Sequence, residues 1–282
     1  MKSSQDRKGW PWATPFSLDR PKVLGIVNVT ADSFSDGRRF LDPAQAIAQG
    51  LRLRDEGADF VDVGGESTRP GSEPVALEEE LRRVIPVVEA LARQGVAVSI
   101  DTTKPAVMRA AIDAGCSVVN DVNAFRASGA IEAVAGAPAG LIVMHMQGTP
   151  ATMQKAPCYD DVVAEVGAFL AGRARALEDA GVAPHRIALD PGFGFGKTVE
   201  HNKALFRAMP ALAQLGYPLL AGLSRKKMLG DFTGRPVAER AAASVAAALL
   251  AVQNGASLVR VHDVKDTVDA IRVWMALRQE TT

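Results

Sequence analysis

Arg186-Ile187-Ala188-Leu189 is a short apolar run, and it continues directly into Asp190-Pro191-Gly192-Phe193-Gly194-Phe195-Gly196-Lys197. Such a run is typical of a buried strand, so a carboxylate stands where that strand ends. Three glycines on alternate positions follow, and glycine is used where the backbone takes φ > 0 or approaches a ligand closely. Two phenylalanines lie between them, and the carboxylate can accept two parallel N–H donors. The stretch therefore predicts a pocket for a planar, nitrogen-rich ring.

Two phosphate-binding motifs are excluded here. Gly196-Lys197-Thr198 is similar to the end of a P-loop, but that loop needs glycine where this chain has Pro191. The dinucleotide-binding fingerprint fails because Lys197 occupies the place of its third glycine. The competing interpretation is an ordinary glycine-rich surface turn, so the choice depends on the rest of the chain.

Composition narrows the class of protein. The 282 residues are 48% hydrophobic and carry no net charge, which gives no electrostatic footprint for nucleic acid or for an anionic membrane. The two cysteines, Cys116 and Cys158, lack metal-site spacing, so neither a disulfide framework nor a cysteine metal site is expected. No signal-peptide pattern and no run of membrane-spanning length is found. We therefore expect a cytoplasmic protein.

Short apolar runs recur along the chain and alternate with segments of helical pattern. Strands are expected at 23–29, 59–64, 97–101, 117–120, 140–145, 186–189, 218–224 and 257–262. Helices are expected at about 43–57, 77–94, 104–114, 128–135, 160–180, 200–214, 237–253 and 265–279. Helical crossovers force parallel strand pairing, and this α/β alternation matches a closed (β/α)8 TIM barrel. An open doubly wound sheet is the alternative.

The chain is expected to form one domain. No linker or break in composition divides 21–282, whereas 1–20 is expected to be a poorly ordered or edge extension. Residues 241–251 are almost all small and apolar, more than one buried helix face requires. Packing within the monomer and a dimer interface explain this segment equally well.

Polar side chains end or directly follow nearly every expected strand. They are Asn28, Glu66, Thr68, Arg69, Asp101, Asn120, His145, Asp190, Ser224, Arg225, Lys226, Arg260 and His262. Any one of them could be a turn, a helix cap or a satisfied core group, His145 in particular. In a barrel, however, these strand ends converge on one face, where active sites are built. Their collection there predicts an active site at the C-terminal ends of the strands.

These polar groups divide into two chemical sets. One offers acceptors and an amide, which suit the polar edge of a heterocycle: Asp101, Asn120 and Asp190. The other offers an oxygen ligand, a hydroxyl, cations and an imidazole, which suit a phosphate or pyrophosphate: Asn28, Thr68, Arg69, Arg260 and His262. Lys226 could contact either set. No His/Cys cluster suits zinc, whereas Mg²⁺ held by one protein oxygen and substrate phosphates is compatible with the sequence.

A series of motifs, in order over about 23–270, resembles the dihydropteroate synthase family. The motifs are Gly25-Ile26-Val27-Asn28-Val29-Thr30-Ala31-Asp32-Ser33-Phe34-Ser35-Asp36-Gly37, Gly64-Gly65-Glu66-Ser67-Thr68-Arg69-Pro70-Gly71, Ser99-Ile100-Asp101-Thr102, Asn120-Asp121, Met144-His145-Met146, Asp190-Pro191-Gly192-Phe193-Gly194-Phe195-Gly196-Lys197, Gly222-Leu223-Ser224-Arg225-Lys226 and Arg260-Val261-His262-Asp263. The first two motifs and the Asp190 motif are highly specific together.

The resemblance implies an enzyme of folate biosynthesis. Its reaction would condense 6-hydroxymethyl-7,8-dihydropterin pyrophosphate with 4-aminobenzoate to give 7,8-dihydropteroate and pyrophosphate. The resemblance also implies Mg²⁺ as cofactor, inhibition by sulfonamides, a homodimer, and a dissociative mechanism in which the C–O bond breaks before the amine attacks.

The same resemblance implies roles for individual residues. The pterin would be held by Asp101, Asn120, Asp190 and Lys226, with Met144, Gly194 and Phe195 lining its pocket. Mg²⁺ would bind Asn28, and the departing pyrophosphate would bind Arg260 and His262. The aminobenzoate subsite would be shaped by Phe34, Thr68, Pro70 and Ser224, and Asp36 and Arg69 would lie on two closing loops. Those expected to act in catalysis are Asp36, Arg69, Asp101 and Lys226.

The sequence departs from the family pattern in the first loop. Ala31 stands where that loop usually has proline, and Arg38 where a second glycine often follows Gly37. Neither change removes a group with a named role, but both could alter how the loop orders.

Two alternatives use the same barrel. A pterin-binding methyltransferase would share the Asp and Asn pocket, but it would not need the motif at 66–71 or the cluster at 224–226. A non-catalytic paralogue would bind pterin for another purpose, and intact Asp36, Arg69 and Lys226 argue against it.

Overall fold

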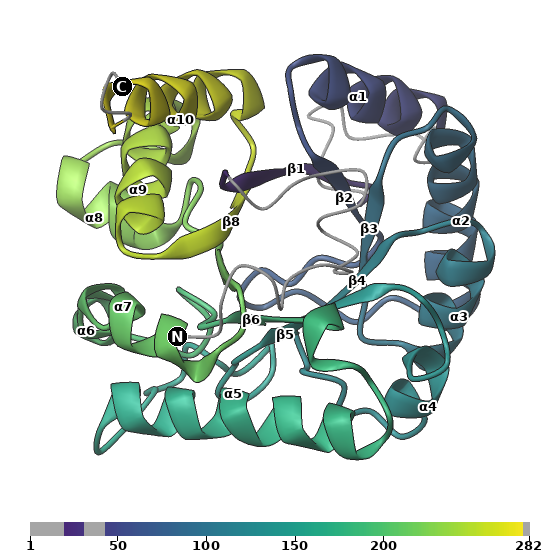
Figure 1. The fold of residues 1–282 in the computed structure, drawn as a ribbon, viewed down its shortest axis with the longest axis horizontal. Coiled ribbons are helices and arrows are strands. Elements are labelled where there is room, and N and C mark those ends of the chain that lie inside the picture. The colour runs from purple at the N-terminus through teal and green to yellow at the C-terminus, as the bar shows by residue number, and fades with distance from the viewer. Residues whose placement is uncertain (1–19, 31–42, 279–282) are drawn as a thin grey trace.

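The computed structural model describes residues 20–30 and 43–278, and its strands form one closed parallel barrel (Figure 1). Each strand pairs with its neighbours in chain order, and β8 closes the barrel against β1. The strands are β1 (Lys22–Asn28), β2 (Phe60–Gly64), β3 (Val98–Asp101), β4 (Val118–Asp121), β5 (Gly140–Met144), β6 (Ile187–Asp190), β7 (Leu219–Ala221) and β8 (Ala256–Val261). The predicted (β/α)8 barrel is confirmed, and the open sheet is wrong.

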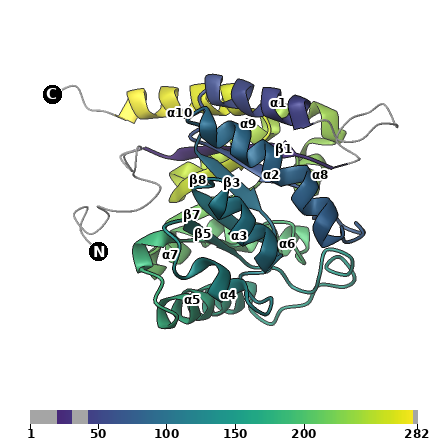
Figure 2. The same cartoon turned by 90° about the vertical axis from the view of Figure 1, so that its right-hand side faces the viewer.

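Helices surround the barrel (Figure 1). They are α1 (Pro43–Asp55), α2 (Leu77–Arg93), α3 (Pro105–Asp113), α4 (Ala130–Val134), α5 (Val162–Asp179), α6 (Val199–Arg207), α7 (Met209–Leu212), α8 (Lys227–Thr233), α9 (Ala241–Gln253) and α10 (Val264–Arg278). In the side view, α1 and α10 cover one side of the barrel and α4 and α5 the opposite side (Figure 2).

Three expectations about the elements need correction. The helix expected at 200–214 is divided into α6 and α7, because Pro210 has no N–H and lies in the first turn of α7. Helix α8 was not expected, and the helix expected from 237 begins at Ala241 after a short 3-10 turn. The strand expected at 218–224 ends at Ala221, and the chain then turns, with Lys226 N donating to Leu223 O at 3.2 Å.

The inward direction of the polar residues at the strand ends follows from the side chains that fill the barrel. An apolar layer fills the barrel, and its members are Leu24, Phe60, Val118, Ile142, Ala188, Leu220 and Leu258. Side chains along a strand alternate between two faces, so the residue two positions further on also points inward. Those next residues include Asp62, Asn120, Met144, Asp190 and Arg260. The strand register therefore places a polar layer directly above the apolar one.

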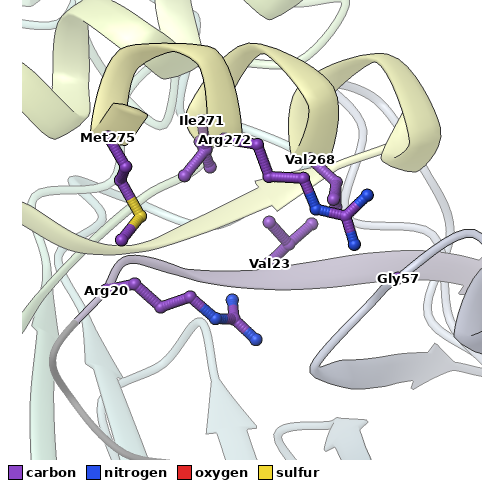
Figure 3. Close-up of a pocket in the computed structure, with 7 residues that line it drawn as sticks. All are labelled: Arg20, Val23, Gly57, Val268, Ile271, Arg272 and Met275. Atoms are coloured by element: carbon purple, nitrogen blue, oxygen red, sulfur yellow. The ribbon is translucent and has the colours of Figure 1, made fainter. Parts of the chain in front are cut away.

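A small cavity of about 90 Å³ lies between the start of β1 and α10 (Figure 3). It is at the N-terminal end of the strands, opposite the polar layer. Arg20, which lines it, is held by Asp59 through bonds of 2.9 and 2.6 Å. The cavity is therefore lined by a residue that holds the structure together at the N-terminal end of the barrel.

Both cysteines are free thiols in the structure. Cys116 is buried, whereas Cys158 is exposed in the β5–α5 loop. The side chain of Gln147 fixes Cys158 through its backbone, accepting from the amide at 3.0 Å and donating to the carbonyl at 2.7 Å. None of the helices in the described part of the chain is long and apolar enough to cross a membrane.

Candidate active site

Arg260 organises the polar layer of the barrel. Its Nε donates to Asp62 Oδ2 at 2.5 Å, and its Nη2 donates to Asp101 Oδ2 at 2.9 Å. Asn120 Nδ2 donates to the same Asp62 oxygen at 3.4 Å. Among the described residues, Asp62 Oδ1 and Ser99 Oγ have no hydrogen-bond partner. The predicted residues Asp101, Asn120 and Arg260 are thus brought together, and acceptor capacity remains between them.

Burial shifts the pKa of the charged groups in this layer. It raises the pKa of Asp101 to about 7, against the charge of Arg260 and with the help of Asp62. It also raises the pKa of Asp190, an effect that nearby Lys226 opposes. Burial lowers the pKa of Lys226 to about 8, which the carboxylate of Asp190 opposes. Shifts of this kind are characteristic of functional sites.

Asp190 and Lys226 lie beside an apolar wall. Lys226 Nζ donates to Phe193 O and lies 4.7 Å from the centre of the Phe195 ring. Phe195 packs against the cluster of Val122, Met144, Met146 and Met153. A Cβ atom at Gly194 would lie 3.3 Å from Lys226 Cδ, so the backbone closely approaches this lysine. The predicted residues Lys226, Gly194 and Phe195 therefore lie together, and Phe195 connects them to Met144.

The backbone of the glycine loop, residues 191–197, is held by side chains at every carbonyl from Gly192 to Gly196. Lys197 donates to Gly192 O and to Phe195 O, each at 3.0 Å, and Lys226 donates to Phe193 O. Gln154 donates to Gly194 O at 2.6 Å, and Tyr159 donates to Gly196 O at 2.8 Å. Asn202 Oδ1 also accepts from Gly194 N at 2.8 Å. Lys197 of the loop itself therefore holds two of these carbonyls, and side chains of the β5–α5 and β7–α8 loops hold the other three.

Two glycines of this loop cannot carry a side chain. Gly192 has φ +67°, and a Cβ atom there would lie 1.9 Å from His145 O. Gly196 has φ +62°, and its Cβ would lie 2.5 Å from Gln147 O. L-residues rarely adopt such φ values, and the contacts are with backbone, which cannot easily move.

His145 points away from this pocket. Its Nδ1 lies 2.9 Å from Lys197 Nζ, and its ring packs edge-on against Phe169 with the ring centres 4.9 Å apart. Burial lowers the pKa of His145 to about 3, and the charge of Lys197 adds to this effect. The interpretation of His145 as a satisfied core imidazole is therefore the better one.

Ser224 and His262 face each other at the ends of β7 and β8. Ser224 Oγ lies 2.9 Å from His262 Nδ1 and accepts from His262 N at 3.2 Å. Burial, together with the charges of Arg260 and Arg225, lowers the pKa of His262 to about 4. The imidazole is therefore neutral at pH 7. Arg225 has φ +58° and is held in this strained conformation by its ion pair with Asp263.

Four of the remaining predicted residues lie at the end of β1 or in the loop after β2. Asn28 ends β1 next to Gly64 of β2, and Thr68, Arg69 and Pro70 follow β2 in the loop to α2. Thr68 is half-buried, and Arg69 and Pro70 are exposed. Phe34 and Asp36 lie outside the described residues, as do Ala31 and Arg38.

The side-chain amide of Asn28 is compatible with a magnesium site. The described part of the chain holds no group of three His, Cys, Asp or Glu residues that could bind a metal ion. A carboxylate cage is therefore not the kind of site present there. Mg²⁺ commonly keeps few protein ligands and completes its shell with phosphate oxygens and water, which fits a single amide oxygen.

Sequence reasoning missed Asp62 and the anchoring role of Lys197. Asp62 is the one charged residue within Phe60–Gly64, a strand buried on both faces. A charge in such a strand must be paired, and this signal could have predicted a cationic partner. Which cation is the partner depends on the closure of the barrel, which places β2 and β8 on either side of β1, and local sequence does not contain that information.

Comparisons with known proteins agree with this geometry. Residues 24–262 match the family model of pterin-binding enzymes. The chain is 52% identical over 265 residues to dihydropteroate synthase of Neisseria meningitidis serogroup C, covering 92% of this chain and 94% of that protein.

Solved structures show the same similarity. Dihydropteroate synthase of Xanthomonas albilineans, in complex with 7,8-dihydropteroate, is 52% identical with a TM-score of 0.85, covering 94% of this chain and 96% of that chain. That of Yersinia pestis, in complex with a sulfonamide drug, is 44% identical with a TM-score of 0.89, covering 93% and 95%. The chain therefore belongs to the dihydropteroate synthase family of pterin-binding enzymes.

Proposed function

We propose that this enzyme condenses 6-hydroxymethyl-7,8-dihydropterin pyrophosphate with 4-aminobenzoate to give 7,8-dihydropteroate and pyrophosphate. The observation that carries the proposal is the placement of Lys226 against Phe195 and near Asp190, with Phe195 packed on Met144, close to the Asp101–Arg260–Asp62 trio. It combines a polar edge for a pterin with an apolar face for its ring. The similar Xanthomonas albilineans enzyme was solved with 7,8-dihydropteroate, the product of this condensation.

The pterin would bind through its hydrogen-bonding edges. The Asp190 carboxylate would accept paired N–H groups of the ring, and the Asn120 amide would both donate and accept. Lys226 would donate to a ring acceptor and keep its cationic contact with Phe195. Met144, Gly194 and Phe195 would cover the flat faces. Because the glycine loop is already fixed, this pocket needs little rearrangement to bind.

The leaving group would depart toward the cationic side of the site. The C–O bond of the substrate breaks first, and pyrophosphate takes the electron pair. Bound Mg²⁺ would supply Lewis-acid stabilisation of that leaving group, with Asn28 as its protein ligand. Arg260 and His262 would add positive charge or donors on the protein side. Asp62 and Asp101 share one guanidinium, so when both are ionised this trio has a net charge of −1, which favours the pterin cation.

The second substrate would enter a subsite formed by Thr68, Pro70, Ser224 and Phe34. Its arylamine attacks the methylene carbon of the pterin cation and then loses a proton. An arylamine is already nucleophilic, so no strong general base is needed. Asp36 and Arg69, on the two loops, would close the site and exclude water that would capture the cation. Sulfonamides would occupy this same subsite.

We also propose that the enzyme is a cytoplasmic homodimer with one domain over 21–282. The apolar helix α9 supports a dimer, because its exposed Leu250 lies among small residues that permit close helix packing. Sedimentation of the full chain would test this assembly.

A pyrophosphate-release assay tests the proposed reaction. Release should require the pterin pyrophosphate, Mg²⁺ and 4-aminobenzoate, and 7,8-dihydropteroate should appear in equal amount. Release without aminobenzoate incorporation would contradict the condensation. Methyl transfer from a folate to a corrinoid, tested in parallel, should not be found; its detection would favour the methyltransferase alternative.

A further inference from the structure

The segment of residues 66–75, which makes up most of the β2–α2 loop, is closed at its base by one carboxylate. Glu66 Oε2 accepts from the backbone N–H of Val75 at 2.9 Å, which joins the first residue of the loop to its last. The same oxygen accepts from Lys104 Nζ at 2.5 Å. We call this junction of Glu66, Val75 and Lys104 the neck of the loop.

The neck is anchored to a buried carboxylate behind it. Lys104 Nζ also donates to Glu80 Oε2 at 2.5 Å, and Glu80 is fully buried on α2. Thr102 Oγ1 donates to Glu80 Oε1 at 2.6 Å and accepts from Lys104 N at 3.2 Å. Thr102 directly follows Asp101 of the polar layer, so the neck is connected to the strand end that carries a predicted pterin ligand.

The charge of Lys104 favours its position between Glu66 and Glu80. Burial alone would lower the pKa of Lys104, but its hydrogen bonds to Glu66 and Glu80 raise that pKa above its ordinary value. Lys104 therefore stays cationic between two carboxylates. Charge-assisted hydrogen bonds of this kind are among the stronger ones in proteins.

Beyond the neck, few hydrogen bonds hold the loop. Ser72 Oγ donates to Ser67 O at 2.5 Å and to Arg69 O at 2.8 Å. Gly71 N donates to Pro150 O of the β5–α5 loop at 3.2 Å. Arg69 and Pro70 themselves are exposed. The placement of Thr68 and Arg69 therefore depends strongly on where the neck holds the ends of the loop.

We propose that Glu66, held by Lys104, is a positioning residue that orders the 66–75 loop for the second substrate without touching either substrate. This inference rests on the proposed function. It predicts a separation of effects, because the glycine loop holds the pterin pocket independently. Loss of the neck impairs aminobenzoate binding and leaves pterin binding intact.

The test uses two substitutions in the full chain. Glu66→Ala removes the neck but leaves the Lys104–Glu80 ion pair, so the buried carboxylate keeps its partner and the protein is expected to fold. Its KM for 4-aminobenzoate should rise about tenfold. Glu66→Gln retains an acceptor for Val75 N without the charge, and its KM should rise about threefold. Calorimetric affinity for the pterin pyrophosphate should match that of the wild type in both.

A matched control is Glu200→Ala, which removes the exposed ion pair with Lys203 on α6. Its KM values should equal those of the wild type. The inference is overturned if Glu66→Ala keeps its aminobenzoate KM, or if pterin affinity falls by the same factor. Failure of the proposed function is distinguishable, since the wild type itself would then show no aminobenzoate-dependent release of pyrophosphate.

Discussion

The glycine loop and the β2–α2 loop lie at the same end of the barrel, but they are held in different ways. In the glycine loop, five consecutive carbonyls, from Gly192 to Gly196, accept hydrogen bonds from Lys197 of the loop itself and from side chains of two neighbouring loops. In the β2–α2 loop, the strongest ties join its two ends at Glu66, and Arg69 and Pro70 are exposed. The first arrangement gives a pocket that exists before ligand arrives. The second gives a segment whose outer part is held by fewer contacts than its base.

This difference indicates an order of binding. A pocket that is already formed costs little to occupy, whereas a subsite assembled from mobile segments costs ordering entropy when it forms. Pterin pyrophosphate should therefore bind the free enzyme, and aminobenzoate should bind well only after the outer loop is ordered.

The largest expected effect is a loss of folding stability, tested by substituting one glycine in each loop. Gly192→Ala places a Cβ atom against His145 O, in addition to its φ of +67°, and should lower the free energy of unfolding by about 3 kcal/mol. Gly71→Ala has a similar φ of +81° but no atom within 4 Å, so only the backbone strain of about 1 kcal/mol applies. Urea unfolding of both variants measures the difference. Equal losses would show that the two loops are equally constrained.

A substitution in the polar layer tests the preformed pocket directly. Asp190→Asn replaces a carboxylate that accepts paired donors with an amide that accepts only one, and should weaken pterin pyrophosphate binding by about 1.5–3 kcal/mol. Calorimetry on the folded variant measures this affinity. Asp231→Asn, at an exposed position on α8, serves as control and should bind as the wild type does. Unchanged affinity in Asp190→Asn would remove this residue from the pterin site.

Binding of aminobenzoate should depend on pyrophosphate and Mg²⁺. Free enzyme should show little affinity for aminobenzoate or a sulfonamide, and adding both pyrophosphate and Mg²⁺ should tighten binding about tenfold. The coupling is reciprocal, so aminobenzoate should tighten pyrophosphate by the same factor. EDTA should abolish the coupling and turnover while the melting temperature of the ligand-free protein stays unchanged. Equal aminobenzoate affinity with and without pyrophosphate would refute the ordered scheme.

The smallest expected effect concerns pH. The pKa of His262 is lowered to about 4 by burial and by its cationic neighbours, so this imidazole is neutral in the free enzyme at pH 7. A bound anion raises that pKa, and affinity for pyrophosphate then increases as pH falls toward the pKa of the complex. Between pH 8 and 6 the wild type should gain about threefold in pyrophosphate affinity over His262→Gln. Pyrophosphate itself titrates equally in both proteins, so its titration cancels in the comparison. The same pH dependence of affinity in the wild type and in His262→Gln would exclude His262 as the titrating group.

Short apolar runs alternating with helical segments were sufficient to predict the architecture of this protein. Asn120, Asp190 and Arg260 lie at or near the ends of such runs, so they could be assigned to the face of the barrel where the strand ends converge. The division of the helix at Pro210 could also have been read from the sequence, because proline starts a helix better than it continues one.

Other features could not be predicted because they depend on distant pairing. Lys197 looks like part of a phosphate-binding motif, yet its ammonium bonds carbonyls of its own loop and His145. The neck likewise joins Glu66 to Lys104, 38 residues later. Helix α8 is short, and it follows a turn at Arg225 whose left-handed φ of +58° no propensity would predict.

The contrast between the two thiols makes the native sequence suitable for site-selective labelling. Burial raises the pKa of Cys116 to about 12, against the effect of its bond to Val118 O, so it carries almost no nucleophilic thiolate at neutral pH. Cys158 is exposed and directly precedes Tyr159, which donates to Gly196 O. A maleimide fluorophore should therefore attach at one place, beside the glycine loop. The protein thus carries its own reporter position for following ligand-induced motion in real time, without any engineered cysteine.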